Sequence, residues 1–444
     1  MRNSDEVEDN CGKSFGFGNT LIIGAGPAGI HAAVCWSGVS EQLGLLNRAG
    51  QHADLARREL ELNSYIVRCE VRVSGREQLS GSARIARFYS GYDQLEDGWQ
   101  TVVICTPVGS YAEVIEGLQP SRLRHLRRII LLSPGIGSGA WIVHLLGEER
   151  ARVEVISLST YFGASKFISE ESPLLSVVKA LKRSIRLGST IASSDACQAV
   201  AELLTAQGIL CIPTSSPLAA ECFSITTYVH PPLSMSEMAL AHIFSQDGPV
   251  RYMYKLYPEG PISPRTMGSM VRLWKELSQV LCKLGVEAFN LLKFLQDDNY
   301  PVREESLERV IVEQFVELDE VRQEYALYVR YASLLIDPYS EPDGQGRYVD
   351  FAAVPFQRAT VENGVLRIPR VPQEDAQRLE LLLRLGARLD VPMPEADGLL
   401  AGYKAAYRRF CTGSGTDGEG AEPSIHHVEV QVDAILDFTQ NSHF

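Results

Sequence analysis

Short apolar runs alternate with longer helical stretches through the first half of the chain. Several of these runs are apolar at almost every position, among them TLIIGA, TVVICTP, RIILLSP and VEVISLS. This pattern is typical of strands that helices cover on both faces of a parallel sheet. We therefore expect a parallel α/β sheet, with strands near residues 20–25, 42–47, 65–71, 101–106, 128–133, 153–159, 189–193 and 208–213.

Helical periodicity replaces the strand pattern after Pro213. Apolar residues recur at helical spacing in 269–295, 304–335 and 372–409, whereas 337–370 is rich in Pro, Gly and Asp and predicts an irregular segment. The pattern predicts a division of the chain into an N-terminal extension over 1–18, an α/β domain over 19–215, a mainly helical domain over 216–411, and a flexible linker and tail over 412–444.

The composition is that of a globular protein that acts on small molecules. The chain has 444 residues, 45% of them hydrophobic and 22% charged, and a net charge of −13, which argues against a nucleic-acid or anionic-membrane partner. Its nine cysteines form no CxxC pair, which indicates reduced thiols and a cytoplasmic location. We find no secretory signal, and no apolar run approaches the roughly 20 residues of a membrane span.

A glycine-rich loop follows the first predicted strand. The sequence Gly24-Ala25-Gly26-Pro27-Ala28-Gly29 passes directly into the helical run IHAAVCW. In such a loop the first glycine permits a tight turn, the second lets the backbone approach a pyrophosphate, and the third lets the helix pack close to the strand. Gly24, Gly26, Pro27, Ala28 and Gly29 therefore predict dinucleotide binding by a Rossmann-type domain. A purely structural glycine turn is the alternative.

The end of the second predicted strand favours NADP over NAD. An NAD site has an acidic residue about 20 residues beyond the loop, where it binds the ribose hydroxyls. This chain has Asn47 and Arg48 there, and a guanidinium pairs with a 2′-phosphate that a carboxylate would repel. We expect NADPH as the cofactor, with Asn47 and Arg48 in its site. Arg57 and Arg58 either add to this pocket or lie on a solvated helix face.

Two further strand ends are expected at the same edge of the sheet, because ligands bind outside the carboxyl ends of parallel strands. They carry Thr106-Pro107 and Pro134-Gly135. Both leave their strands with residues that stop pairing and free backbone amides, which predicts contacts with the nicotinamide ribose and the pyrophosphate.

His230 is the candidate catalytic residue. It lies in TTYVHPPL, directly after the predicted domain boundary, where a substrate would meet the cofactor. An imidazole titrates near neutrality and can donate or accept a proton as hydride moves. The alternative is a histidine that fixes a Pro-rich turn. The loop YKLYPEGPIS at 254–263 predicts either a substrate wall or an interdomain turn. No His, Cys and Asp spacing resembles a catalytic zinc site, so we expect no metal site.

These motifs resemble those of the opine metallophore dehydrogenases, the group that includes the staphylopine, pseudopaline and yersinopine dehydrogenases. The resemblance extends to about Phe410 and rests on GAGPAGIHAA, CTP, SPGIGSG and LGST, and above all on TYVHPPL and YKLYPEGPIS. It implies an opine-dehydrogenase fold, in which an N-terminal Rossmann domain is followed by a helical C-terminal domain that closes over the cleft.

The resemblance also implies a reaction. Members of the family use NADPH to reduce the imine formed between the primary amine of a histidine-derived aminobutyrate intermediate and a 2-oxo acid, which gives a nicotianamine-like metal chelator. Pyruvate is the favoured oxo acid and 2-oxoglutarate the other candidate. His230 matches the family's histidine and Arg48 its basic 2′-phosphate reader. The stretch STYFGASK lacks the acidic residue expected in some relatives, so the carboxylate partner of His230 stays unassigned.

Several alternatives stay open from the sequence. Arg265, Lys255 and Arg330 are candidate clamps for a substrate carboxylate, and nothing in the sequence chooses among them. A 2-hydroxy-acid or glycerol-phosphate type dehydrogenase shares the Rossmann domain followed by helices, and a non-catalytic NADP-sensing protein could use the same loop. We expect a homodimer with two small-molecule partners, the amine intermediate and the 2-oxo acid.

Overall fold

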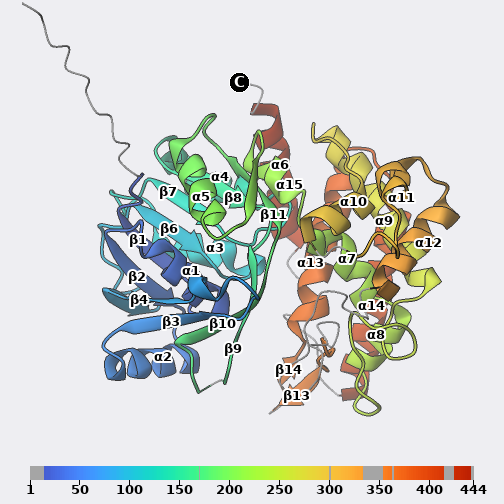
Figure 1. Ribbon diagram of the computed structural model, residues 1–444, viewed down its shortest axis with the longest axis horizontal. Coiled ribbons are helices and arrows are strands. Elements are labelled where there is room, and N and C mark those ends of the chain that lie inside the picture. The colour runs from blue at the N-terminus through green and yellow to red at the C-terminus, as the bar shows by residue number, and fades with distance from the viewer. Residues whose placement is uncertain are drawn as a thin grey trace, which may run out of the picture.

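The protein forms an α/β domain and a mainly helical domain that lie side by side (Figure 1). The computed structural model describes residues 15–169, 171–299, 302–333, 354–362, 365–414 and 425–441. Within these residues, no helix combines the length and the apolar character needed to cross a membrane.

The α/β domain is built on an eight-stranded sheet with the order β12-β11-β8-β7-β6-β1-β2-β5. All neighbouring strands are parallel except β11 and β8. This sheet and the helical domain that follows confirm the predicted fold class. The strands are β1 (Asn19–Ile23), β2 (Gln42–Asn47), β5 (Arg87–Ser90), β6 (Thr101–Ile104), β7 (Arg128–Leu131), β8 (Glu154–Leu158), β11 (Ser184–Ser189) and β12 (Leu210–Pro213).

Helices cover both faces of this sheet, which explains why its central strands are apolar on both faces. Leu21 and Ile23 of β1 share a buried cluster with Val114 of α3, whereas Ile22 packs on the other face with Ile30 of α1. The helices of this domain are α1 (Pro27–Trp36), α2 (Gln51–Leu62), α3 (Tyr111–Leu118), α4 (Ser138–Leu146) and α5 (Asp195–Thr205).

The sequence missed a second, smaller sheet and misplaced one strand. The smaller sheet has the order β4-β3-β10-β9 and contacts α1. Its strands are β3 (Ile66–Val71), β4 (Gly81–Arg84), β9 (Gly163–Phe167) and β10 (Leu175–Leu181). The strand predicted at 189–193 was wrong, because β11 ends at Ser189, whose hydroxyl accepts the N–H of Ile191 and turns the chain out of the sheet.

The helical domain packs around α9 (Pro264–Lys283), which contacts α7 (Ile225–Ser234), α12 (Glu320–Ser333), α13 (Arg370–Arg388) and α14 (Pro394–Ser414). Its shorter helices are α6 (Pro217–Glu221), α8 (Glu237–Ile243), α10 (Leu291–Phe294) and α11 (Arg309–Gln314), with a π-helix at Leu295–Asn299. A hairpin of β13 (Thr360–Glu362) and β14 (Val365–Arg367) lies in the segment predicted to be irregular, of which 337–353 fall outside the described residues.

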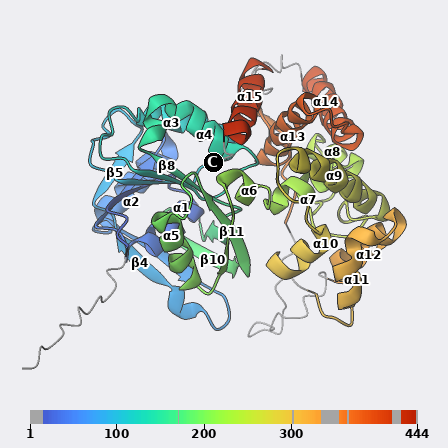
Figure 2. The ribbon, with the colours of Figure 1, turned by 90° about the horizontal axis from the view of Figure 1, so that it is seen from above.

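The tail contains a helix that contacts both domains. The prediction of a flexible linker and tail over 412–444 was wrong for Ile425–Asn441, which forms α15 between α4 and α13 (Figure 2). Val432 and Ile435 of α15 are fully buried, at a spacing that places them on one helix face. Ile435 packs so closely on Gly137 that a Cβ there would lie 2.2 Å from its Cδ1 atom.

The buried carboxylate of Glu221 also joins the two domains. Glu221 ends α6 and accepts hydrogen bonds from the N–H groups of Gly137 at 2.9 Å and Gly139 at 2.7 Å, and from the Ser157 hydroxyl at 2.6 Å. Both amides belong to the start of α4, where a helix leaves its first N–H groups without partners within the helix. Glu221 therefore fixes the start of the helical domain on the Rossmann domain.

Burial raises the pKa of Glu221 from its ordinary value of 4.5 to about 8, against the opposing effect of its hydrogen bonds. A raised pKa in the folded state gives a stability contribution that is complete below about pH 4.5 and is lost as the pH rises toward 8. Each unit of displacement corresponds to about 1.4 kcal/mol. We expect the difference in unfolding free energy between wild type and Glu221→Gln to shrink between pH 5 and pH 8 in urea titrations. The exposed-residue control Glu116→Gln should show no such trend, and a constant difference for Glu221→Gln would contradict the assignment.

Candidate active site

The glycine loop lies between β1 and α1, as the sequence predicts. Gly24 has a φ of +103°, and a Cβ on Gly29 would lie 1.8 Å from the Gly24 carbonyl oxygen, so both positions require glycine. Gly26 caps α1 and Pro27 occupies its first turn, but no side chain caps the amides there. A Cβ on Gly26 would meet no protein atom within 4 Å. The loop thus leaves an open helix N-terminus that fits a pyrophosphate.

Two side chains, one at the end of β2 and one at the start of α2, hold the glycine loop in place. Asn47 Oδ1 accepts the Ala25 N–H at 3.1 Å, and His52 Nε2 donates to the Ala25 carbonyl at 3.0 Å. Asn47 therefore supports the loop in addition to its predicted cofactor role, and His52 is a supporting residue that the sequence did not reveal. Arg48 directly follows β2 and is exposed. Arg57 and Arg58 are likewise exposed, on α2.

Thr106 and Pro107 follow β6 beside this loop. The Thr106 methyl carbon would lie 3.1 Å from a Cβ on Gly24, and the Thr106 hydroxyl is buried without a partner among the described residues. Pro107 is exposed and precedes a short 3-10 helix. An unpartnered buried hydroxyl beside the glycine loop fits a position that a bound ligand completes.

The other predicted strand end has a different role. Pro134 and Gly135 are buried, and the Gly135 N–H donates to the Ser138 hydroxyl at 2.9 Å. The next amides along this loop belong to the Glu221 interaction described above. The expectation of free backbone amides after β7 was therefore wrong, because the nearby Ser138 hydroxyl and the distant Glu221 carboxylate accept from them. Pro134 and Gly135 remain close to the predicted cofactor site, at the boundary between the domains.

His230 lies on α7, between side chains of two other segments. Its Nδ1 atom is 3.5 Å from Asp375 Oδ1 on α13, and its Nε2 atom is 3.2 Å from the Tyr254 hydroxyl. Asp375 is 3% exposed, and its second oxygen accepts a hydrogen bond from Ser234 at 2.9 Å. The arrangement orients the imidazole with Nδ1 toward a fixed carboxylate and Nε2 toward the loop at 254–263.

The carboxylate partner that the sequence left unassigned is therefore Asp375. In the sequence, Asp375 looks like an ordinary acidic residue in the first turns of a helix. The Pro-rich stretch around His230 was expected as a turn in the alternative interpretation, but it is helical through Pro231 and Pro232. Tyr254 brings the aromatic loop at 254–263 to the histidine.

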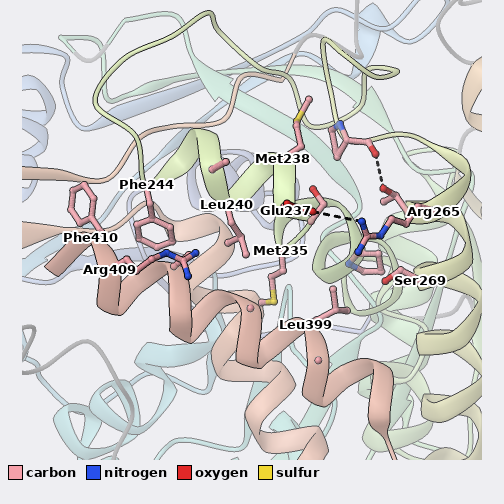
Figure 3. A pocket seen from close by; sticks show the side chains of 18 of the residues that line it. Met235, Glu237, Met238, Leu240, Phe244, Arg265, Ser269, Leu399, Arg409 and Phe410 are labelled. Carbon is pink, nitrogen blue, oxygen red and sulfur yellow. Dashed lines mark hydrogen bonds and ion pairs between the residues drawn. The ribbon is translucent and has the colours of Figure 1, made fainter. Parts of the chain in front are cut away.

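The three candidate clamps lie in different surroundings. Arg265 is almost fully exposed and lies 3.6 Å from Glu237. Both residues line a surface groove of about 1600 Å³ between α8, α9 and α14, and neither His230 nor Asp375 is among its described lining residues (Figure 3). Arg330 is buried in the helical domain and donates to the Leu295 carbonyl at 2.9 Å. Lys255 belongs to the loop that carries Tyr254.

Comparison with known proteins decides the family. The model of the staphylopine dehydrogenase family matches residues 18–438. The pseudopaline synthase of Pseudomonas aeruginosa (strain UCBPP-PA14) is 41% identical over 417 residues, which cover 93% of this chain and 94% of that protein. The chain belongs to the staphylopine dehydrogenase family. The yersinopine synthase of Yersinia pestis is 36% identical to this family member over 434 residues, with 91% and 94% of the two chains covered.

A solved structure extends the same comparison to the fold. A yersinopine dehydrogenase with NADP+ bound matches this staphylopine dehydrogenase family member with a TM-score of 0.86 and 33% identity, over 95% of this chain and 99% of that chain. The predicted family, fold class and enzyme class are thus confirmed. The protein is an oxidoreductase of the opine dehydrogenase type.

The open space at Gly26 gives a direct test of the loop. Gly26→Val should fold normally, because the backbone of Gly26 is extended and a Cβ there would meet none of the described residues within 4 Å. The same side chain would occupy the approach to the pyrophosphate, so we expect loss of NADPH binding in fluorescence titrations, with an unchanged melting temperature of the free protein. The control is Gly38→Val, because a Cβ at Gly38 also has open surroundings and Gly38 lies outside the glycine loop. Gly98 is unsuitable as a control because its φ is positive. Retained NADPH affinity in Gly26→Val would mean that the loop is only structural.

Proposed function

We propose that this protein is an NADPH-dependent opine metallophore dehydrogenase. It joins the primary amine of a histidine-derived aminobutyrate intermediate to a 2-oxo acid, with pyruvate favoured over 2-oxoglutarate, and reduces the resulting imine to a nicotianamine-like metal chelator. The observation that carries the proposal is His230, held by Asp375 and Tyr254 on the helical domain where that domain meets the nucleotide-binding domain.

NADP is the cofactor, in agreement with the glycine loop of this chain and with the NADP+ complex of its structural relative. The start of α1 would hold the pyrophosphate, and Arg48 at the end of β2 would pair with the 2′-phosphate. Thr106, Pro107, Pro134 and Gly135 would border the nicotinamide side of the site. Bound NADPH supplies the hydride for the reduction.

His230 would handle the proton that condensation and reduction require. The Asp375 carboxylate lies 3.5 Å from Nδ1, which leaves Nε2 as the atom that would face a substrate and exchange a proton with it. Loss of water from the amine and oxo-acid adduct needs a proton on the departing oxygen, and an imidazolium Nε2 can donate it. Asp375 stabilises that imidazolium, and Ser234 keeps the carboxylate in place. Tyr254, at 3.2 Å from Nε2, can bind the same polar substrate atoms.

The proposed reaction is tested by NADPH oxidation with the aminobutyrate derivative of histidine and either pyruvate or 2-oxoglutarate, with the product identified by mass spectrometry. We expect turnover only when both substrates are present. His230→Ala should lower turnover about 10²- to 10⁴-fold, the usual contribution of a general acid or base. Asp375→Asn should lower it as well, and both variants should bind NADPH like wild type.

Two outcomes would reject the proposal. Reduction of an oxo acid without any amine would indicate a 2-hydroxy-acid type dehydrogenase. Tight NADPH binding without turnover on any amine and oxo-acid pair would indicate a dinucleotide-sensing protein. Wild-type rates in His230→Ala would remove His230 from the mechanism.

The assignment of Arg48 predicts a change in cofactor preference. Arg48→Glu should weaken NADPH binding about 10- to 100-fold, because a charge-assisted bond to the 2′-phosphate is replaced by repulsion. NADH lacks this phosphate, so its affinity should change little. Arg124→Glu, at an exposed arginine outside the predicted cofactor pocket, is the charge-reversal control. Equal losses for both cofactors in Arg48→Glu would be inconsistent with a role in reading the phosphate.

A further inference from the structure

A partly buried arginine near the His230 pair has a hydrogen-bond donor that no described protein group uses. Arg378 lies on α13, one turn beyond Asp375, and its side chain is 18% exposed. Its Nη1 donates to Thr226 Oγ1 at 3.1 Å, and its Nη2 is 3.8 Å from Glu374 Oε2. The Nε atom is buried and has no partner among the described residues. A buried donor without a partner is costly, which points to a ligand atom at this position.

The unused donor belongs to a group of similar atoms at the domain boundary. A Cβ on Gly135 of the Rossmann domain would lie 3.6 Å from Arg378 Nε. The hydroxyls of Thr106 after β6, Tyr111 at the start of α3 and Thr227 on α7 are also buried without partners in the described structure. Tyr111 and Arg378 interact electrostatically, and burial raises the pKa of Tyr111, so its hydroxyl stays protonated as a donor. Both domains thus contribute polar atoms near this boundary that have no hydrogen-bond partner among the described residues.

The packing of α7 on α13 sets the distance between Arg378 and the catalytic candidate. Thr226 and His230 are one turn apart on α7, and they pair with Arg378 and Asp375, one turn apart on α13. Residues at this spacing on one helix face are roughly 5–6 Å apart. A 2-oxo acid carries its carboxylate directly on the carbon that reacts. The amine proposed here carries a carboxylate on the carbon that bears its nitrogen. Either substrate can therefore reach from Arg378 to His230.

Arg378 also retains positive charge for such a ligand. Glu374, its ionic neighbour, is shared with Arg370, whose Nε lies 2.8 Å from the other carboxylate oxygen. Two guanidinium groups and one carboxylate leave one positive charge in excess. Arg370 has a side chain that is 68% exposed, whereas Arg378 is the member of the pair that faces the Rossmann domain.

We propose that Arg378 binds a substrate carboxylate next to the reacting atoms, either that of the 2-oxo acid or that on the amine-bearing carbon, and thereby places those atoms beside His230. The planar guanidinium presents adjacent donors that match the two oxygens of a carboxylate. This inference rests on the proposed function, because it takes both substrates to be carboxylates. Arg378 thus contributes to substrate specificity: a neutral amide in place of the carboxylate would leave the guanidinium unpaired.

Binding and turnover test the proposal separately. Pyruvate and 2-oxoglutarate are titrated calorimetrically into the NADP+-loaded protein, for wild type, Arg378→Gln, Arg378→Lys and the control Arg384→Gln. Arg384 lies on the same helix, where it pairs with Glu380 and with Glu429 of α15. The same proteins are assayed for the KM of the amine, the KM of the oxo acid and kcat, and for the ratio of rates with pyruvate and pyruvamide.

We expect Arg378→Gln to raise one substrate KM about 10- to 100-fold, the effect of losing a charge-assisted hydrogen bond. A rise in the oxo-acid KM, with weaker oxo-acid binding and a lost preference for pyruvate over pyruvamide, assigns the clamp to the oxo acid. A rise in the amine KM assigns it to the amine. Arg378→Lys should recover part of the loss, and NADPH affinity and melting temperature should match those of Arg384→Gln.

Other results overturn the inference. Unchanged KM values for both substrates in Arg378→Gln would show that the guanidinium binds neither carboxylate. Weaker NADPH binding alone would make Arg378 a cofactor ligand, and a loss in Arg370→Gln instead would move the clamp to Arg370. If wild type binds an oxo acid through Arg378 but turns over no amine, the clamp stands and the proposed reaction fails. If the wild type catalyses the proposed reaction and Arg378→Gln has unchanged KM values, the proposed reaction stands and the carboxylate clamp fails.

Discussion

The position of the site depends on a buried carboxylate at the domain boundary. Glu221 accepts two amides of the loop that begins α4 and a hydroxyl of β8, and so holds α6 against the Rossmann domain. A short link joins α6 to α7. The Tyr228 hydroxyl of α7 donates to the Cys222 carbonyl in this link at 2.7 Å. His230 follows on the same helix. Separation of the domains here would break all three of these hydrogen bonds at once. These contacts therefore limit how far His230 can move relative to the glycine loop.

A second connection acts on the opposite side of the same loop. Ile435 of α15 fills the space where Gly137 has no side chain, and α15 packs along α13, which carries Asp375. The positive φ of Gly137 also excludes most other residues. The loop after β7 therefore contacts two elements. One is α6, which leads into the helix of His230, and the other is α15, which packs on the helix of Asp375. The proton-handling groups lie on packed helices, and the loop at 254–263 contributes Tyr254.

Local patterns made the nucleotide half of the site predictable, whereas contacts between distant segments did not. Gly24, Gly26 and Gly29 act through backbone geometry that is specified within one strand, turn and helix, so their spacing was sufficient. Asp375 could not be found in this way, because its role depends on the register between α7 and α13. The amides after β7 looked free because their acceptor, Glu221, belongs to the other domain. The tail helix had a usable signal in the helical spacing of Val428, Val432 and Ile435, but the Gly-rich stretch before it favoured a flexible tail.

Net charge and local charge point in different directions in this protein. A net charge of −13 argues against polyanionic partners, yet the substrates and cofactor proposed here are themselves anions. The overall negative charge and the binding of small anions are compatible because individual arginines lie at the proposed anion sites. Arg48 is exposed at one end of the cofactor site, and Glu374 is shared by two arginines at the domain boundary, which leaves positive charge where anionic groups would bind. Because screening weakens exposed charges beyond about 10 Å, the acidic surface elsewhere opposes small anions only weakly once they reach these guanidinium groups. Selectivity against large polyanions and affinity for small carboxylates can therefore coexist in one acidic chain.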